Sequence, residues 1–381
     1  MVRTIPEHTT KTSFLACGFN NEAGFTDIRR VVNVANYHIG PRTGANLRYL
    51  KYLYMSIGVA LFGVIIAETD FGDAVAHLAQ FGWGLAIVLA LYLTSFSMDA
   101  LTWLVTLHTA PLNLRWFSRL WRIRLVGEAF NMTVPAGGMG GEPVKAILLK
   151  KRYGVGYREG AASLLMSKTV NILALLLFLS AGFFLMLRHT AIPETYVVAG
   201  GFGLTALTFG IVSFFAIQRF QLSSILTGKL EQWPVFRSIV GKLDDIREVE
   251  NHFLEFYSRD KLRFTGAMAL ALLSWAIGVL EIYYALEFLG HPVSLAEAWI
   301  IESMTQMVRA GSFFIPASIG AQDGAFVLMC TAITGSPELG VAVALVRRMR
   351  EIIWIASGFA LASLLHLWPR EVSRNEKNGN R

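Results

Sequence analysis

Two short segments combine proline, glycine and a carboxylate in the same order, and they hold the residues best suited to chemistry. The first is NMTVPAGGMGGEPVK, residues 131–145, and the second is PASIGAQDG, residues 316–324. In each segment a carboxylate, Glu142 or Asp323, follows a proline by seven residues. Proline and glycine interrupt helices, and non-helical backbone at membrane depth survives only where protein or a watery cavity satisfies it. Both segments are therefore predicted to be re-entrant hairpins.

The first segment has the composition of an anion-binding turn. Glu142 is predicted to cap a short helix whose first turn holds Pro143, with Lys145 one turn further on. Free N–H groups at a helix amino end attract phosphate or carboxylate. The segment is either a cradle for a lipid headgroup or a tight structural turn before a capped helix. Its candidate binding residues are Asn131, Pro135, Gly137, Gly138, Gly140, Gly141, Glu142 and Lys145.

Three polar residues share one face of the helix that precedes the second segment. They recur at spacings of four and three, which places them one above another. They either line a polar path through the membrane or face outer water on an amphipathic helix. The candidates are Glu302, Gln306 and Arg309, followed in the second segment by Pro316, Gly320, Gln322 and Asp323.

Three arginines and one glutamate lie well inside the last apolar span, where an unpaired charge costs several kcal/mol. Arg347 and Glu351 are four residues apart and are able to pair within the helix. Because three arginines face one carboxylate, at least one positive charge needs another partner: Asp323, Glu302 or a lipid phosphate. The candidates are Arg347, Arg348, Arg350 and Glu351.

Further polar residues lie singly in other apolar spans. Lys168 and Asn171 share a helix face by their spacing. Each of these residues either completes the polar path or pairs between helices and merely fixes the bundle. They are Asp99, Lys168, Asn171 and Glu281.

Membrane-spanning helices must position these side chains. The 381 residues are 54% hydrophobic and 16% charged, and the mean hydropathy is +0.48. Since a helix needs roughly 20 apolar residues to cross about 30 Å of hydrocarbon, the predicted fold is an all-α polytopic membrane protein of about six full transmembrane helices plus the two hairpins. The predicted spans cover residues 50–67, 82–107, 161–187, 197–217, 264–289 and 339–367.

Basic residues beside the spans set the predicted orientation, with both termini in the cytoplasm. Residues 1–48 are predicted to be a polar cytoplasmic arm, 49–368 the transmembrane domain and 369–381 a cytoplasmic tail. Within the domain, residues 218–263 have apolar residues at helical spacing between charges, which predicts a cytoplasmic amphipathic segment. A basic cytoplasmic loop is expected to carry Arg115, Arg119, Arg122 and Arg124.

The same count of orientations predicts an inverted repeat. Six spans with both ends inside obey the positive-inside rule only if the first hairpin enters from the cytoplasm and the second from outside. The spans at 82–107 and 264–289 then run in opposite directions, which is the signature of an inverted-topology repeat.

Charge and cysteine content exclude several classes of protein. The net charge of +7 resides in short segments beside apolar spans, so it reflects topology and no nucleic acid is expected as a partner. Cys17 and Cys330 have no metal-ligand spacing, and no ATP-binding motif is present. We expect neither a metal site nor a cofactor.

The two hairpin segments, together with the helix VRRMRE at residues 346–351, resemble the lysylphosphatidylglycerol-synthase transmembrane family, also called the flippase-like family. The resemblance covers about residues 50–368. The forms FFIPASIGAQDG and RRMREIIW are most similar to its hopanoid-biosynthesis-associated branch, although Asp323 stands where glutamate is expected. The soluble aminoacyl-transfer domain of full synthases is not expected in this chain, so lipid aminoacylation by it is not expected either.

The resemblance implies translocation or handling of a lipid, hopanoid or anionic phospholipid, in a bacterial inner membrane. The lipid is then the main partner, and enzymes of lipid biosynthesis are further partners. One alternative is a non-catalytic assembly partner of such enzymes that docks through residues 218–263. Another is an intramembrane transferase with Glu142 or Asp323 as general base, against which no HExxH, paired acidic or Ser-His motif is found. We therefore expect no enzyme.

Overall fold

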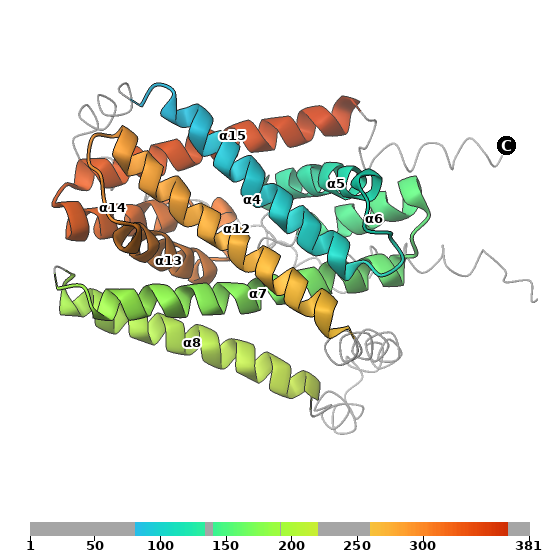
Figure 1. The fold of residues 1–381 in the computed structure, drawn as a ribbon, viewed down its shortest axis with the longest axis horizontal. Coiled ribbons are helices and arrows are strands. Elements are labelled where there is room, and N and C mark those ends of the chain that lie inside the picture. The colour runs from blue at the N-terminus through green and yellow to red at the C-terminus, as the bar shows by residue number, and fades with distance from the viewer. Residues whose placement is uncertain (1–80, 134–139, 191, 220–259, 365–381) are drawn as a thin grey trace, which may run out of the picture. The chain divides into compact units, whose positions relative to one another are not determined.

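The computed structural model describes residues 81–133, 140–190, 192–219 and 260–364, and these residues form helices joined by short connections (Figure 1). Several predictions fall outside them: the amino-terminal arm, the first span, most of the amphipathic segment and the carboxyl-terminal tail. Three predicted binding residues, Pro135, Gly137 and Gly138, also lie outside the described residues.

The described helices are α4 (Gly84–Thr106), α5 (Leu114–Thr133), α6 (Glu142–Tyr153), α7 (Tyr157–Leu187), α8 (Glu194–Arg219), α12 (Lys261–Phe288), α13 (Leu295–Gly311), the 3-10 turn η1 (Pro316–Ser318), α14 (Ala321–Thr334) and α15 (Pro337–Leu364).

Four of these helices are long and apolar enough to cross a membrane: α4, α7, α12 and residues 194–213 of α8. They coincide with four predicted spans, which confirms an all-helical, multi-pass membrane protein. The helix α15 has 28 residues, a sufficient length, but its interior holds Arg347, Arg348, Arg350 and Glu351. The described residues therefore confirm four of the predicted spans by hydropathy, and the total of six stays a prediction.

Both proline-glycine segments separate two packed helices, as the sequence predicts. The first separates α5 from α6, and the second, with η1 in it, separates α13 from α14; each pair is in contact. The predicted basic loop is wrong, because Arg115 to Arg124 lie within α5. Buried Leu120 and Ile123 on one face explain the helix, since their spacing lets an arginine-rich stretch bury an apolar side.

The helices α4 and α12 cross side by side and run in opposite directions (Figure 1). At the middle of the seam, the hydroxyls of Ser95 and Ser274 lie 2.9 Å apart. At one end, His108 Nε2 lies 2.6 Å from Asp260 Oδ2. The opposite directions predicted for these two spans are confirmed, and the contact brings the two halves of the described bundle together.

The helix α13 is enclosed by other helices: it packs against α7, α8, α12 and α14. Apolar residues such as Ile300, Ile301 and Met304 are buried there, and so are the polar Glu302 and Gln306. A buried carboxylate needs a partner, so this position requires positive charge from a neighbouring helix. The helix α15 supplies it.

Candidate functional site

A cavity of about 320 Å³ lies among α4, α5, α6, α7, α12, α13 and α15. Its volume is within the range of about 300–1,000 Å³ that small-molecule sites occupy. Charged residues inside a membrane bundle are costly and mark functional sites. Among the described residues that line it are six cations, Arg124, Lys145, Lys168, Arg309, Arg347 and Arg350, and five carboxylates, Asp99, Glu128, Glu142, Glu281 and Glu302.

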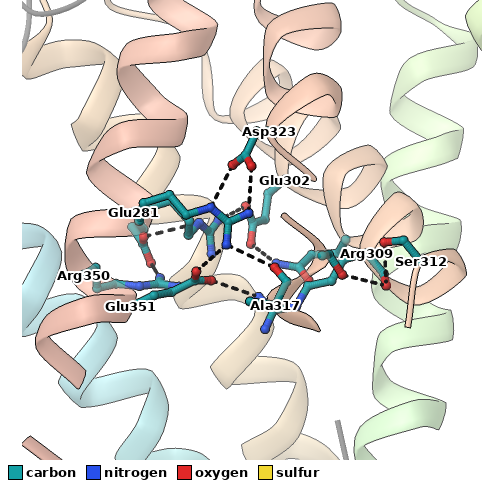
Figure 2. A network of polar contacts seen from close by, with 12 residues as sticks. Glu281, Glu302, Arg309, Ser312, Ala317, Asp323, Arg350 and Glu351 are labelled. Carbon is teal, nitrogen blue, oxygen red and sulfur yellow. Dashed lines mark hydrogen bonds and ion pairs between the residues drawn. The ribbon is translucent and has the colours of Figure 1, made fainter. Parts of the chain in front are cut away.

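A set of ion pairs that we call the arginine cluster lies partly in the wall of the cavity and partly behind it (Figure 2). Its members come from α12, α13, α14 and α15, so it ties four helices together. Its four positive charges match its four negative charges, which makes the set neutral. The cluster consists of Arg309, Arg347, Arg348, Arg350, Glu281, Glu302, Asp323 and Glu351.

Arg348 makes the most contacts in the arginine cluster. Its guanidinium binds Asp323 through two parallel contacts, Nε to Oδ1 and Nη2 to Oδ2, both at 3.0 Å. Its Nη1 donates to the carbonyl oxygen of Ala317 at 3.0 Å and to Glu351 Oε2 at 2.6 Å. A bidentate arginine is geometrically rigid, so α15 holds both α14 and η1 in place.

The turn that Arg348 holds is strained. Ala317 and Ser318 have φ values of 52° and 49°, in the left-handed region that L side chains disfavour. Gly320 follows at φ 81°, where glycine pays no such penalty, and its N–H donates to Asp323 Oδ2 at 2.8 Å. The predicted tip residues Gly320 and Asp323 therefore shape the turn directly.

The other buried arginines of α15 reach across to α12 and α13. Arg347 pairs with Glu302 and lies 3.7 Å from Glu281 Oε1, while Arg350 pairs with Glu281. Arg350 also lies over the ring of Tyr92, 3.8 Å from its centroid. The extra partners that the arginine excess requires are thus carboxylates of neighbouring helices.

Glu351 pairs within α15, but with Arg348 three residues earlier and not with the predicted Arg347. It binds Arg348 at 2.6 Å, and its Oε1 lies 3.6 Å from Arg309 Nη1. The predicted partner Arg347 is turned to Glu302 and Glu281 instead. These carboxylates hold Arg347 because they are buried, and a buried carboxylate needs a positive partner.

The part of the cavity wall that α4, α5, α6 and α7 supply carries a second neutral set, which we call the lysine cluster. Arg124 Nη2 lies 2.8 Å from Asp99 Oδ2, and Lys145 Nζ lies 2.9 Å from Glu142 Oε1. Lys168 Nζ is 3.9 Å from the same Glu142 oxygen. With three cations and three carboxylates, the set is balanced. The lysine cluster consists of Asp99, Arg124, Glu128, Glu142, Lys145 and Lys168.

Asn131 joins α5 to α6 behind the lysine cluster. Its Oδ1 accepts from the N–H of Gly141 at 2.6 Å, and its Nδ2 donates to Glu128 at 3.3 Å and to Glu142 at 3.4 Å. A Cβ on Gly141 would strike the carbonyl oxygen of Gly127, so α5 and α6 approach this closely only with glycine at position 141. A Cβ on Gly127 would strike the side chain of Lys145.

The predicted capping role of Glu142 is wrong. Gly141 is the N-cap of α6, and Glu142 is the first residue of the helix. The carboxylate of Glu142 is turned to Lys145 and Asn131, so it does not bind the free backbone N–H groups of the first turn. Lys145 lies one turn beyond Glu142, as predicted, and the structure shows that the two side chains pair.

Two cations of the cavity are more exposed than the others and lie further from their carboxylate partners. The side chains of Lys168 and Arg309 are 43% and 31% exposed, against 4% for Lys145 and Arg347. Their nearest carboxylate contacts, at 3.9 and 3.6 Å, are longer than hydrogen bonds. An anion that entered the cavity would therefore meet these two cations at least cost.

The structure brings most predicted site residues to this cavity. Lining residues from both hairpin regions include Glu142, Lys145 and Arg309, and Glu302 and Gln306 face inward, not to outer water. Gln322 is fully buried, and both polar atoms of its amide lack a hydrogen-bond partner. The other predicted residues in the cavity wall are Asp99, Lys168, Asn171, Glu281, Arg347 and Arg350.

Some predicted residues lie behind the wall, and some lining residues escaped the sequence analysis. Asn131 and Glu351 bind residues of the wall and are not part of it. Asp323 lies further back, because its partner Arg348 is not a lining residue either. Glu128 and Arg124 were missed as lining residues, although their spacing of four on an amphipathic stretch is a usable signal. In the part of the chain that the structure describes, no three His, Cys, Asp or Glu side chains are placed to hold a metal ion together.

An apolar groove of about 390 Å³ adjoins the cavity between α6 and α7. Its apolar lining is supplied by small and branched side chains. The cavity and the groove share Glu142, Leu164 and Lys168, so they meet at the lysine cluster. The remaining residues of the groove are Pro143, Ala146, Ala161 and Leu165.

Comparisons with known proteins agree with this membrane architecture. The family model of the lysylphosphatidylglycerol synthase TM region matches residues 53–358. A UPF0104 membrane protein of Pyrococcus horikoshii is 22% identical over 315 residues, which cover 78% of this chain and 92% of the relative. Another, from Methanothermobacter thermautotrophicus, is 20% identical over 328 residues, 81% of this chain and 92% of the relative. No solved structure matches the chain. The chain belongs to the lysylphosphatidylglycerol synthase transmembrane-region family.

Proposed function

We propose that the protein binds the polar headgroup of a membrane lipid in its charged cavity and moves that lipid across the bilayer. The observation that carries the proposal is the cavity itself: eleven charged side chains face one space inside a bundle of membrane helices. Charged side chains inside a bundle of membrane helices are typical of a substrate path. We further propose that the chain acts without catalysing a reaction and without a cofactor.

The arrangement of charge favours a headgroup that carries phosphate. Among the described residues, six cations and five carboxylates line the cavity directly, and the charge that balances them lies behind the wall, at Arg348, Asp323 and Glu351. The charges are already paired within the protein, so a ligand has to exchange partners as it enters and leaves. Such exchange keeps binding weak enough for release, which transport requires. Lys168 and Arg309 are the cations best able to make the exchange.

Recurrence of helices supports a mechanism in which one half rocks against the other. The helices α4, α5, α6 and α7 begin 177 to 181 residues before α12, α13, α14 and α15, respectively. The antiparallel seam between α4 and α12 is compatible with an inverted repeat. Transporters built from inverted repeats bind substrate between the repeats and expose it alternately to the two sides.

The identity of the lipid is proposed at two levels. The charged lining favours an anionic phospholipid such as phosphatidylglycerol. The resemblance of residues 313–324 to the hopanoid-associated branch favours a hopanoid, which offers the cavity less charge. We also propose the bacterial inner membrane, with cytoplasmic termini, as the location. Enzymes of lipid biosynthesis remain proposed partners, with residues 218–263 as their docking segment.

The test is transbilayer movement of fluorescent lipids in proteoliposomes. Phosphatidylglycerol and a hopanoid are compared in vesicles that hold the wild type, Glu142→Ala, Lys168→Gln or Arg309→Gln. We expect the wild type to move one of the two lipids. Each variant should slow that movement by about tenfold or more, because loss of one charged contact worth about 1.4 kcal/mol changes a rate or binding constant by a factor of ten.

The outcome that contradicts the proposal is equally clear. If folded wild-type protein moves neither lipid above the rate of empty vesicles, translocation by this chain is wrong. The assembly-partner alternative then predicts that wild-type protein, but not a variant lacking residues 220–259, recovers lipid-synthesising enzymes from the membrane.

A further inference from the structure

The apolar groove between α6 and α7 ends where the charged cavity begins. Ala161, on the first turns of α7, is exposed, and Leu164 is buried at the boundary between groove and cavity. Lys168, one turn beyond Leu164, is shared by both spaces. A polar space and an apolar space are thus joined along one face of α7.

Only an amphiphile matches both spaces at once. A water-soluble anion would use the cavity and leave the groove empty, and a hydrocarbon would use the groove and leave the charges unmatched. In a phospholipid, a single glycerol unit joins the charged phosphate to the acyl chains. Its chemistry therefore changes from polar to apolar over a short distance, as the protein surface does at Glu142 and Lys168.

The geometry points to a lateral access site, in which one acyl chain of an anionic phospholipid lies in the groove between α6 and α7 while Lys168 binds its phosphate. This inference rests on the proposed function and adds to it where the lipid is held and by which group.

The ion pairs at the boundary allow Lys168 to change partner. Its contact with Glu142 is 3.9 Å long, whereas Lys145 lies 2.9 Å from the same oxygen and Asn131 also donates to it. When Lys168 turns to a phosphate, Glu142 keeps two partners and is not left as an isolated buried charge. Lysine suits this role because its ammonium is a compact charge on a flexible stem.

The groove acts by shape, because the bilayer around it is as apolar as its walls. Moving an acyl chain from lipid into the groove gains no hydrophobic free energy. Affinity and headgroup preference therefore come from Lys168, and the groove decides whether a chain fits beside it. The two contributions are separable by substitution.

The test uses phosphatidylglycerol with a photoreactive diazirine in one acyl chain, at a small fraction in phosphatidylcholine vesicles that contain the full-length protein. After illumination, cross-linked peptides are located by mass spectrometry. The wild type is compared with Ala161→Trp, which fills the groove, and with Ala181→Trp, which adds the same side chain at another exposed alanine of α7. A photoreactive phosphatidylcholine controls for the headgroup.

We expect cross-links at residues 143–146 and 161–165 in the wild type and in Ala181→Trp, and about tenfold fewer in Ala161→Trp. Lys168→Gln is expected to keep these positions but to lose the preference for phosphatidylglycerol over phosphatidylcholine. The inference is overturned if Ala161→Trp and Ala181→Trp give equal cross-linking in the groove, or if Lys168→Gln keeps the preference.

Failure of this inference is distinguishable from failure of the proposed function. Lipid movement that persists without groove cross-links overturns the access site and leaves translocation standing. Groove cross-links that follow the expected pattern without any lipid movement support the access site and reject translocation. Circular dichroism and size-exclusion chromatography of both tryptophan variants identify any that fail to fold, and Lys168→Gln then provides the independent result.

Discussion

The two charged clusters of the cavity are both neutral, yet they differ in how firmly their cations are held. In the arginine cluster, Arg348 alone makes hydrogen bonds to three residues, and Arg347 and Arg350 are almost fully buried. In the lysine cluster, Lys168 is 43% exposed and meets its carboxylate at 3.9 Å. The difference suggests a division of labour, in which one cluster fixes helices and the other exchanges partners.

The residue types fit that division. Arginine offers a planar fork with several donors, which suits fixed contacts to carboxylates on neighbouring helices. Lysine offers one mobile charge, which suits exchange. We therefore expect substitutions in the arginine cluster, apart from Arg309, to act mainly on stability, and substitutions at the two exposed cations, Lys168 and Arg309, to act mainly on lipid movement.

The largest effect on stability is expected from Arg347→Ala. It leaves Glu302 and Glu281 short of a positive partner in a buried place, and breaking a buried pair from one side costs about 3–5 kcal/mol. Thermal unfolding in detergent should show a markedly lower midpoint or no folded protein. The double variant Arg347→Leu with Glu302→Leu should recover part of the loss. An unchanged midpoint in Arg347→Ala would show that the arginine cluster does not fix the bundle.

A second effect is expected from Gly141→Ala, at the contact between α5 and α6. The added Cβ meets the carbonyl oxygen of Gly127, and overpacking of this kind costs about 1–3 kcal/mol. Gly156→Ala is the matched control, because nothing lies within 4 Å of a Cβ there. The two unfolding midpoints should differ, with only Gly141→Ala lowered. Equal midpoints would mean that α5 and α6 are free to separate.

A more local effect is expected from Arg348→Lys. Lysine cannot reach Asp323, Ala317 and Glu351 together, so the strained turn η1 loses its clamp at a cost of about 1–3 kcal/mol. Hydrogen exchange should increase at residues 315–321 and change little in α4. Lys168→Arg provides the contrast, with no faster exchange in this turn. Equal hydrogen exchange at residues 315–321 in Arg348→Lys and the wild type would show that Arg348 does not hold the turn.

Sequence patterns predict where most helices lie, but they do not predict which charged residues pair. Hydropathy located α4, α7, α8 and α12 because each is a long apolar run. Proline and glycine located both helix breaks. The four arginines of α5 obscure its amphipathic period, so the sequence predicts a loop where the structure has a helix.

The partners of the charged residues could not be predicted, because they depend on helix packing. Arg124 meets Asp99 from a different helix, and Arg350 meets Glu281 from a position 69 residues away. A carboxylate near many arginines in sequence has several possible partners, and only the relative rotation of the helices selects among them. Spacing within one helix was a better guide, as Lys168 and Asn171 both line the cavity.

The smallest effect on stability is expected from Lys168→Gln. The same variant tests most directly whether the charged cavity handles the lipid headgroup. Its half-exposed pair contributes at most about 1 kcal/mol. The measurement is transbilayer movement of labelled phosphatidylglycerol in proteoliposomes, with Lys151→Gln, an exposed lysine of α6 outside the cavity, as the control. We predict that Lys168→Gln unfolds at the wild-type midpoint yet moves the lipid about tenfold more slowly, while Lys151→Gln matches the wild type. Equal rates in all three proteins would contradict the claim that the charged cavity handles the headgroup.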